Sequence, residues 1–173
     1  MAITRLGGAN AITGTLPAAN INDTSIGNIT ALPAAISTGK VLQVVTNTHT
    51  SRFSTSSTSY VAATGYTIAI TPSATSSKIF VCISAMADNA AANRTNYMTI
   101  YRGSTNLGQS SDGLASTHAV DTRIYTPVTL SVLDSPSTTS AITYQVYIRA
   151  YGGSVVFNDQ ESEAQLTAFE IAG

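Results

Sequence analysis

The sequence predicts an all-β protein, an antiparallel β-sandwich of the jelly-roll-like kind that follows an extended N-terminal arm. From residue 40 onward, short runs of alternating or β-branched residues recur between turn residues. No segment shows the 3.6-residue apolar period of an amphipathic helix. The first 39 residues fit neither this helical period nor the two-residue alternation of a strand. We therefore divide the chain of 173 residues into an arm, 1–39, and a sandwich domain, 40–173.

The arm is nearly uncharged, but its apolar residues are too few and too scattered to build a core of their own. Between Arg5 and Lys40 its one charged residue is Asp23, and Pro17 and Pro33 interrupt any regular element. Ordering this segment would cost on the order of 40–80 kcal/mol of backbone entropy, so we expect it to lie on neighbouring chains. The anchoring contacts predicted in this way are Ile12, Leu16, Ile21, Ile26, Ile29, Leu32 and Ile36.

The first half of the domain begins with a β-branched run at 41–45, which a stretch rich in Ser and Thr follows up to residue 59. Residues 66–71 alternate, and Pro72 closes that strand. Residues 78–86 are apolar on both faces, which is typical of a central strand. Residues 96–102 alternate again up to Gly103.

The second half opens with residues 104–124, which are rich in Gly, Ser and Asp and predict a long loop with a short strand. A strand at 125–133 ends in the turn 134–137. The clearest alternation covers 142–151, after which Gly152 and Gly153 turn the chain into 154–157. The last strand is 165–171. About eight strands with short turns predict a jelly-roll-like sandwich.

Two of these strands carry aromatic residues on one face. Tyr147, Arg149 and Tyr151 lie opposite the apolar set of the strand 142–151, and Tyr97 and Tyr101 share one face of the strand 96–102. Tyrosine and arginine together can stack on sugar rings and bind hydroxyls. The same two residue types are favoured at protein interfaces. The five residues are therefore candidates for a subunit interface or for glycan contact.

We expect no enzymatic activity, and accordingly no catalytic residue, metal or cofactor. His49 and His118 have no Cys or third His to complete a zinc set, and no Gly-x-Ser-x-Gly elbow occurs. Asp159, Glu161 and Glu163 could bind calcium or act on a glycan. We interpret them as a solvated acidic turn, because the glycine and oxygen spacing of an EF-hand is missing.

Composition argues against several partners. Charged residues make up 10% of the chain and the net charge is −1, against roughly 25% charged residues in an average domain. With Lys40 and Lys78 as its only lysines, the chain has no basic patch, and we expect no nucleic-acid binding. The apolar runs are too short for a signal peptide or for insertion into a membrane, so we expect synthesis in a cytoplasm. Cys82, the one cysteine, is interpreted as a small buried hydrophobe.

Several segments share the pattern of one known family. In the domain they are GKVLQVV (39–45), FSTSSTSYV (53–61), IAITPSATSSKI (68–79), YRGS (101–104) and FEIAG (169–173). In the arm they are TLPAANI (15–21) and NITAL (28–32). Together these segments resemble a domain of tail-fibre and other virion proteins of marine bacteriophages. The resemblance implies a homotrimeric virion appendage.

We therefore expect a bacteriophage structural protein located in the virion, a short tail or head fibre. Its arm would anchor it to other virion proteins, and its sandwich would attach to the host surface, with a surface glycan as a candidate ligand. The alternative is a capsid decoration protein whose arm staples coat subunits. A glycan-degrading enzyme is a third class, which would need Asp159 or Glu161. In a trimer we favour the subunit contact for the aromatic face, and loops 88–95 and 104–118 for host contact.

Overall fold

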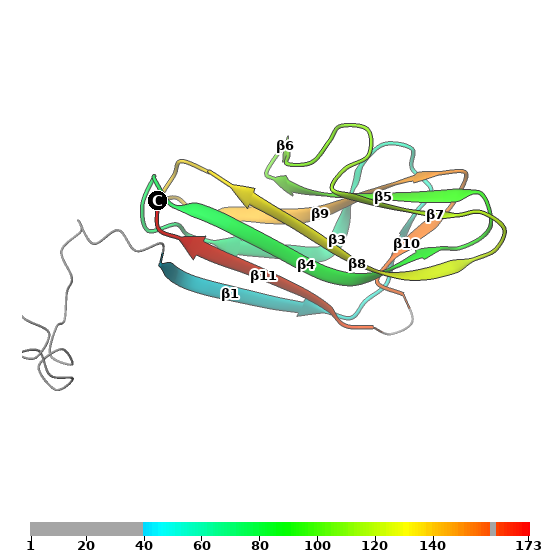
Figure 1. Cartoon of the computed structure of the whole chain (residues 1–173), viewed down its shortest axis with the longest axis horizontal. Coiled ribbons are helices and arrows are strands. Elements are labelled where there is room, and N and C mark those ends of the chain that lie inside the picture. The colour runs from blue at the N-terminus through cyan, green and yellow to red at the C-terminus, as the bar shows by residue number, and fades with distance from the viewer. Residues whose placement is uncertain (1–39, 160–161) are drawn as a thin grey trace, which may run out of the picture. The chain divides into compact units, whose positions relative to one another are not determined.

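The computed structural model describes residues 40–159 and 162–173, which form two packed β-sheets with no helix among them (Figure 1). The strands are β1 (Val41–His49), β2 (Phe53–Thr55), β3 (Val61–Ile70), β4 (Lys78–Asn89), β5 (Arg94–Arg102), β6 (Thr105–Asn106), β7 (Ala115–Ala119), β8 (Ile124–Asp134), β9 (Ile142–Tyr151), β10 (Val155–Phe157) and β11 (Ala164–Ile171). The predicted anchoring residues Ile12, Leu16, Ile21, Ile26, Ile29, Leu32 and Ile36 lie outside the described residues.

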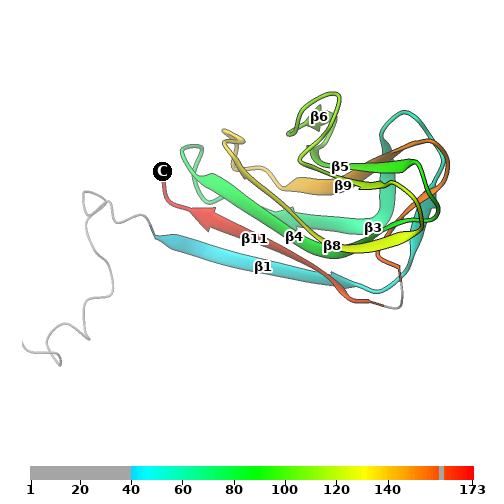
Figure 2. The same cartoon turned by 45° about the vertical axis from the view of Figure 1, so that its right-hand side comes forward.

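The first sheet, here called sheet A, has four strand positions. The long strand β4 pairs with β8 on one side, and with β11 and then β10 on the other. At the next position β1 pairs with β11, and β2 pairs with β10. The sheet therefore runs β1/β2, β11/β10, β4, β8, and all these pairings are antiparallel. Figures 1 and 2 show β1, β11, β4 and β8 side by side in one layer.

The second sheet, sheet B, also has four positions. It runs β3, β9, β5, and the far side of β5 pairs with β7 near its start and with β6 near its end. Numbered along the chain, the strand positions follow the order 1-8-3-6 in sheet A and 2-7-4-5 in sheet B. This is the strand order of a jelly roll. The predicted antiparallel, jelly-roll-like sandwich is confirmed.

Alternation along the strands places the core between the two sheets. The alternating residues of β9, from Tyr144 to Ala150, are buried as predicted. From the facing sheet, Ile79, Val81 and Ile83 of β4 are fully buried in the same core cluster. Each such aliphatic side chain contributes roughly 1.5–3 kcal/mol when it is fully buried.

Some local features differ from the sequence prediction. The strand β2 lies inside the stretch rich in Ser and Thr, and β6 and β7 lie inside 104–124, where a loop with one short strand was predicted. The strand β3 begins at Val61, ahead of the predicted 66–71, and its pairing with β9 is irregular around Gly65, whose φ is 88°. Cys82 is half-buried instead of buried, so that prediction is wrong. Its neighbours Val81 and Ile83 fill the core, and alternation turns Cys82 to the outer face of sheet A.

A buried carboxylate joins β11 to the turn before β4. Glu170 is fully buried and accepts hydrogen bonds from the Ser73 backbone N–H (2.6 Å), the Ser73 and Ser77 hydroxyls (2.6 and 2.7 Å) and the Gln43 amide (2.6 Å). Burial alone would raise the pKa of Glu170, but these hydrogen bonds outweigh it and lower the pKa to about 2. Glu170 therefore stays ionised without a cationic partner in this hydrogen-bond set.

Candidate functional site

The outer face of sheet B brings together four of the five predicted aromatic and arginine residues. In the antiparallel register of β5 and β9, Arg149 is opposite Tyr97, Tyr147 is opposite Thr99, and Tyr101 is the diagonal neighbour of Tyr147. The next residues along each strand are buried in the core, so all four side chains point outward. Each of the four is half-buried.

The four side chains contact one another closely. The rings of Tyr101 and Tyr147 are stacked, with centroids 4.0 Å apart and planes 27° apart. The guanidinium carbon of Arg149 lies 3.9 Å from the ring centroid of Tyr97. Aromatic pairs of this kind add about 0.5–1.5 kcal/mol beyond their burial, and a partly exposed cation–π contact adds about 0.5–1 kcal/mol. The group is therefore ordered before any ligand arrives.

Tyr60 is a further member that the sequence analysis missed. It lies immediately before β3, its ring centroid is 6.4 Å from that of Tyr101, and the Arg149 guanidinium carbon is 5.5 Å from its ring centroid. Its hydroxyl is buried and has no hydrogen-bond partner within the described residues. Burial raises the pKa of Tyr60, and the nearby Arg149 offsets part of this rise. We call Tyr60, Tyr97, Tyr101, Tyr147 and Arg149 the Tyr–Arg cluster.

The loop between β6 and β7 holds Arg149 in place. The backbone carbonyl of Ser111 accepts hydrogen bonds from Nε of Arg149, at 3.0 Å, and from its Nη2. The loop closes at Gly113, whose φ of 73° favours glycine. A Cβ atom there would lie 2.3 Å from the Met98 carbonyl oxygen and 2.8 Å from the Tyr60 hydroxyl. Glycine at this position lets the loop approach the cluster.

Tyr151, the fifth predicted residue, stays apart from the cluster. It is the last residue of β9, is 63% exposed and lies opposite Thr95 in the register. Within the described residues it makes no aromatic or cation–π contact with the cluster. It therefore serves as a natural control for experiments on the other tyrosines.

The two histidines have separate structural contacts. His49, at the end of β1, meets the ring of Tyr66 edge-on at 4.5 Å. Nδ1 of His118, in β7, lies 2.8 Å from the hydroxyl of Thr95. Over residues 40–159 and 162–173, no group of three or more His, Cys, Asp or Glu side chains is arranged to hold a metal ion.

The predicted acidic turn is only in part solvated. Asp159 is buried and forms ion pairs with Arg123 at 2.7 Å and with Arg52 at 3.3 Å, so the prediction of a solvated residue is wrong there. Arg123 also binds both carboxylate oxygens of Asp88, whose side chain is fully buried. Glu163 is exposed, and Glu161 lies outside the described residues. The ion pairs link Asp88 of β4 with Arg123 just before β8, and Asp159 just after β10 with Arg123 and with Arg52 just before β2.

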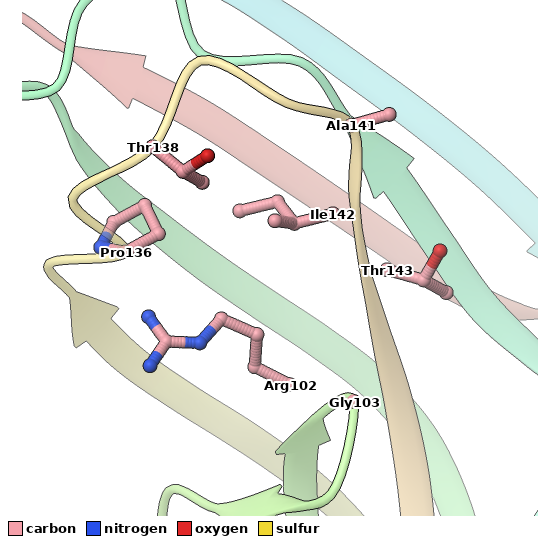
Figure 3. A pocket seen from close by; sticks show the side chains of 7 residues that line it. All are labelled: Arg102, Gly103, Pro136, Thr138, Ala141, Ile142 and Thr143. Atoms are coloured by element: carbon pink, nitrogen blue, oxygen red, sulfur yellow. The ribbon is translucent and has the colours of Figure 1, made fainter.

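A pocket of about 480 Å³ lies between the end of β5 and the β8–β9 connection (Figure 3). Its lining residues are Arg102, Gly103, Pro136, Thr138, Ala141, Ile142 and Thr143. Arg102 is its one charged group, and both oxygens of Asp134 accept hydrogen bonds from Arg102, at 3.1 and 2.9 Å. Asp134 also accepts a hydrogen bond from the buried Tyr144 hydroxyl at 2.7 Å. Because this charge is already paired inside the protein, we do not choose the pocket as the functional site.

No family model matches the sequence, and no curated protein matches it. In the part of the chain that the structure describes, no helix has the length and apolar character needed to cross a membrane.

The Tyr–Arg cluster is suited to noncovalent recognition. Tyrosine rings offer apolar area next to hydroxyls that donate and accept hydrogen bonds. The stacking contacts and the Ser111 carbonyl hold the rings and the guanidinium in one arrangement, so little side-chain entropy remains to be lost on binding. A ligand with alternating hydroxyl and C–H surfaces, as a sugar has, would complement this face.

Proposed function

We propose that this chain is a non-enzymatic structural protein of a bacteriophage virion. It is a homotrimeric surface appendage, a short tail or head fibre, which residues 1–39 anchor to other virion proteins. The jelly roll projects from the particle and attaches it to the host surface. The observation that carries the attachment role is the Tyr–Arg cluster on the outer face of sheet B. The virion location and the trimer rest on the resemblance of the sequence segments described above.

The ligand class follows from the chemistry of the cluster. Its members are half-exposed and ordered by their own contacts, and it combines the apolar rings and hydroxyls of tyrosine with a guanidinium. We therefore assign the host ligand to the polysaccharides of a bacterial surface.

From the sequence we favoured a subunit contact over glycan contact for the aromatic residues, and here we favour glycan contact. Tyrosine and arginine suit a subunit contact as well as a ligand, but the centre of a subunit contact is more apolar than the rest of the surface. Exposed aliphatic side chains gather on the other sheet instead. We therefore assign the cluster to the ligand.

Binding of the full-length chain to an array of purified bacterial surface polysaccharides tests the attachment role. Arg149→Ala and Tyr147→Ala should weaken binding at least tenfold, whereas the matched Tyr151→Ala should bind like the wild type. Circular dichroism on each variant checks that the fold is retained. Equal binding by all four proteins would refute the assignment of the ligand to the cluster.

Electron microscopy of phage particles produced by the genome that encodes this chain tests the location. A gold-labelled antibody against residues 40–173 should mark the tip of a tail or head fibre. Label spread over the capsid lattice would support the decoration role instead. Particles without any label would refute the virion assignment.

A further inference from the structure

The outer face of sheet A carries a continuous row of apolar side chains. Val44 of β1 is opposite Phe169 of β11, Phe169 is opposite Phe80 of β4, and Phe80 is opposite Leu133 of β8. Val44 and Leu133 are 52% and 53% exposed. The two phenylalanines are half-buried, with ring centroids 6.1 Å apart. This apolar row crosses all four strand positions of the sheet.

Further apolar residues lie at one end of the row. Val41 and Leu42 at the start of β1 are 55% and 44% exposed, and Val41 pairs with the half-buried Ile171. The exposed large hydrophobic residues of the described chain are Val41, Leu42, Val44, Val120, Tyr125, Leu133 and Tyr151. Four of these seven belong to the row or to its end, and the other aliphatic one, Val120, lies after β7. The exposed aliphatic surface is therefore concentrated at one place.

Charge is nearly absent from this face. The next row across the sheet consists of Thr46, Thr167, Cys82 and Ser131. Among the outward residues between Lys78 and Ser84 of β4 and their cross-strand neighbours, Lys78 is the one charged side chain. An outer sheet face that meets water is normally polar. A neutral apolar face fits neither nucleic acid nor an anionic membrane, since both select basic residues.

The face is large enough for a specific protein contact. It spans four strand positions, and β4 is 12 residues long. At about 4.8 Å between strands and about 3.4 Å per residue, the whole outer face measures roughly 19 by 40 Å, and its nearly uncharged part from Lys78 to Ser84 roughly 19 by 24 Å. The whole face is close in area to the roughly 800 Å² that each partner buries in a standard protein interface.

We infer that the outer face of sheet A, centred on the apolar row, is the surface through which copies of this chain contact one another. Around a threefold axis, one part of this face on each copy contacts a different part of the same face on the next copy, and a neutral apolar face can do so without charge repulsion. The described surface has no second gathering of exposed aliphatic residues that could serve as a different complement. This inference rests on the homotrimer of the proposed function and adds the surface that forms it.

Cys82 is a built-in reporter for this contact. It is the one cysteine of the chain, it lies one row from the Phe80–Phe169 pair, and it is partly exposed in the single chain. A thiol on a covered face reacts slowly with a bulky reagent, and the same thiol on an open face reacts fast. The reaction rate of Cys82 with Ellman's reagent therefore reports whether this face is covered.

The test uses the full-length chain and the variants Val44→Glu and Leu133→Glu, with Val120→Glu as the matched control. All three positions are more than half exposed, so a glutamate is tolerated in the isolated fold. Light scattering should give a trimer for the wild type and for Val120→Glu, and a monomer for the other two. Cys82 should react at least tenfold faster in the two monomeric variants. Circular dichroism shows whether each variant is folded.

The outcomes separate this inference from the proposed function. If Val44→Glu and Leu133→Glu remain trimers, or if Cys82 reacts fast in the wild-type trimer, the contact surface is elsewhere and the trimer stands. A wild-type monomer with a fast-reacting Cys82 would refute the homotrimer itself. A monomer with a protected Cys82 would mean that the chain covers its own face, which refutes the contact between copies. Attachment to polysaccharide is measured separately and does not depend on these results.

Discussion

Arg149 lies over the ring of Tyr97, its direct neighbour across the β9–β5 strand pair, while the Ser111 carbonyl binds the same guanidinium from the β6–β7 loop. One side chain thus links two strands and a loop on the outer face of sheet B. The outer face of sheet A differs in composition, because it carries a row of aliphatic and phenylalanine side chains and little charge. Because the two faces differ in this way, we assign attachment to sheet B and assembly to sheet A.

Replacing Arg149 by lysine should weaken polysaccharide binding about tenfold although the positive charge is kept. A lysine has no planar guanidinium to lie on Tyr97 while it donates to the Ser111 carbonyl. The stability cost should stay below about 1 kcal/mol, because the contact is partly exposed. Array binding and urea unfolding measure the two effects, with Arg52→Lys as a control remote from the cluster. Unchanged binding would show that charge alone, and not the stacked geometry, serves the ligand.

Gly113→Ala should both destabilise the domain and weaken binding, because the added Cβ would meet the Met98 carbonyl oxygen and the Tyr60 hydroxyl. Gly103→Ala is the matched control, since its φ of 56° is also positive but nothing lies within 4 Å of its Cβ position. We expect about 1 kcal/mol for Gly103→Ala from backbone strain alone, and about 2–4 kcal/mol for Gly113→Ala once the clash is added. Equal urea midpoints for the two variants would contradict the close approach of the loop.

The sheets and much of the cluster could be predicted, because both depend on alternation along single strands. Tyr97, Tyr101, Tyr147 and Arg149 follow from the period of β5 and β9. Tyr60 could not be found in this way, since it precedes its strand in a stretch rich in Ser and Thr. The loop that brings the Ser111 carbonyl to Arg149 depends on the left-handed backbone at Gly113, which the sequence of a long loop does not reveal.

Features that combine distant segments were also beyond the sequence. The apolar row takes one residue from each of four strand positions, and only the register of β1, β11, β4 and β8 aligns them. The apolar character of both faces of β4 correctly indicated its central place in the sheet, but the outer set, with Phe80 and Cys82, is only half-buried. The burial of Asp159 could not be predicted, because its partners Arg52 and Arg123 are remote from it in the chain.

Glu170→Gln should destabilise the domain by about 3 kcal/mol at neutral pH, because an amide cannot accept all the hydrogen bonds that Ser73, Ser77 and Gln43 donate to the carboxylate. The pKa of Glu170 is lowered from 4.5 to about 2 in the folded state. The stability that its ionised form contributes is therefore fully present above pH 4.5 and is lost as the pH falls from about 4.5 to about 2.

Urea midpoints measured between pH 2 and pH 7 check both parts of this prediction. The wild type should lose stability below pH 4.5 more steeply than Glu170→Gln, by about 3 kcal/mol over the whole range. The control is Glu163→Gln, which changes an exposed carboxyl and should follow the wild-type curve. If the stability of the wild type and of Glu170→Gln fell in parallel as the pH is lowered, the hydrogen bonds to Glu170 would not stabilise its ionised form.

A double-mutant cycle on Asp88 and Arg123 tests how much this ion pair contributes to the stability of the domain. The side chain of Asp88 is fully buried, whereas that of Arg123 is 42% exposed. Removing the arginine leaves the buried carboxylate of Asp88 without its bidentate partner, which is strongly destabilising. Removing the charge of Asp88 instead leaves an arginine that water can solvate. Arg123→Ala should therefore lower the urea midpoint more than Asp88→Asn does, and adding Asp88→Asn to Arg123→Ala should restore part of the loss.

Arg52→Ala is the matched control for this cycle, because Arg52 is 54% exposed and lies 3.3 Å from Asp159. Because Arg52 is mostly solvated and Asp159 keeps Arg123 as its second partner, removing Arg52 should change the urea midpoint little. If the double variant were as unstable as the sum of the two single variants, the buried charge of Asp88 would not be the source of the loss. The cost of Arg123→Ala would then come from its other contacts, the ion pair with Asp159 and the cation–π contact with Tyr125 at 4.7 Å.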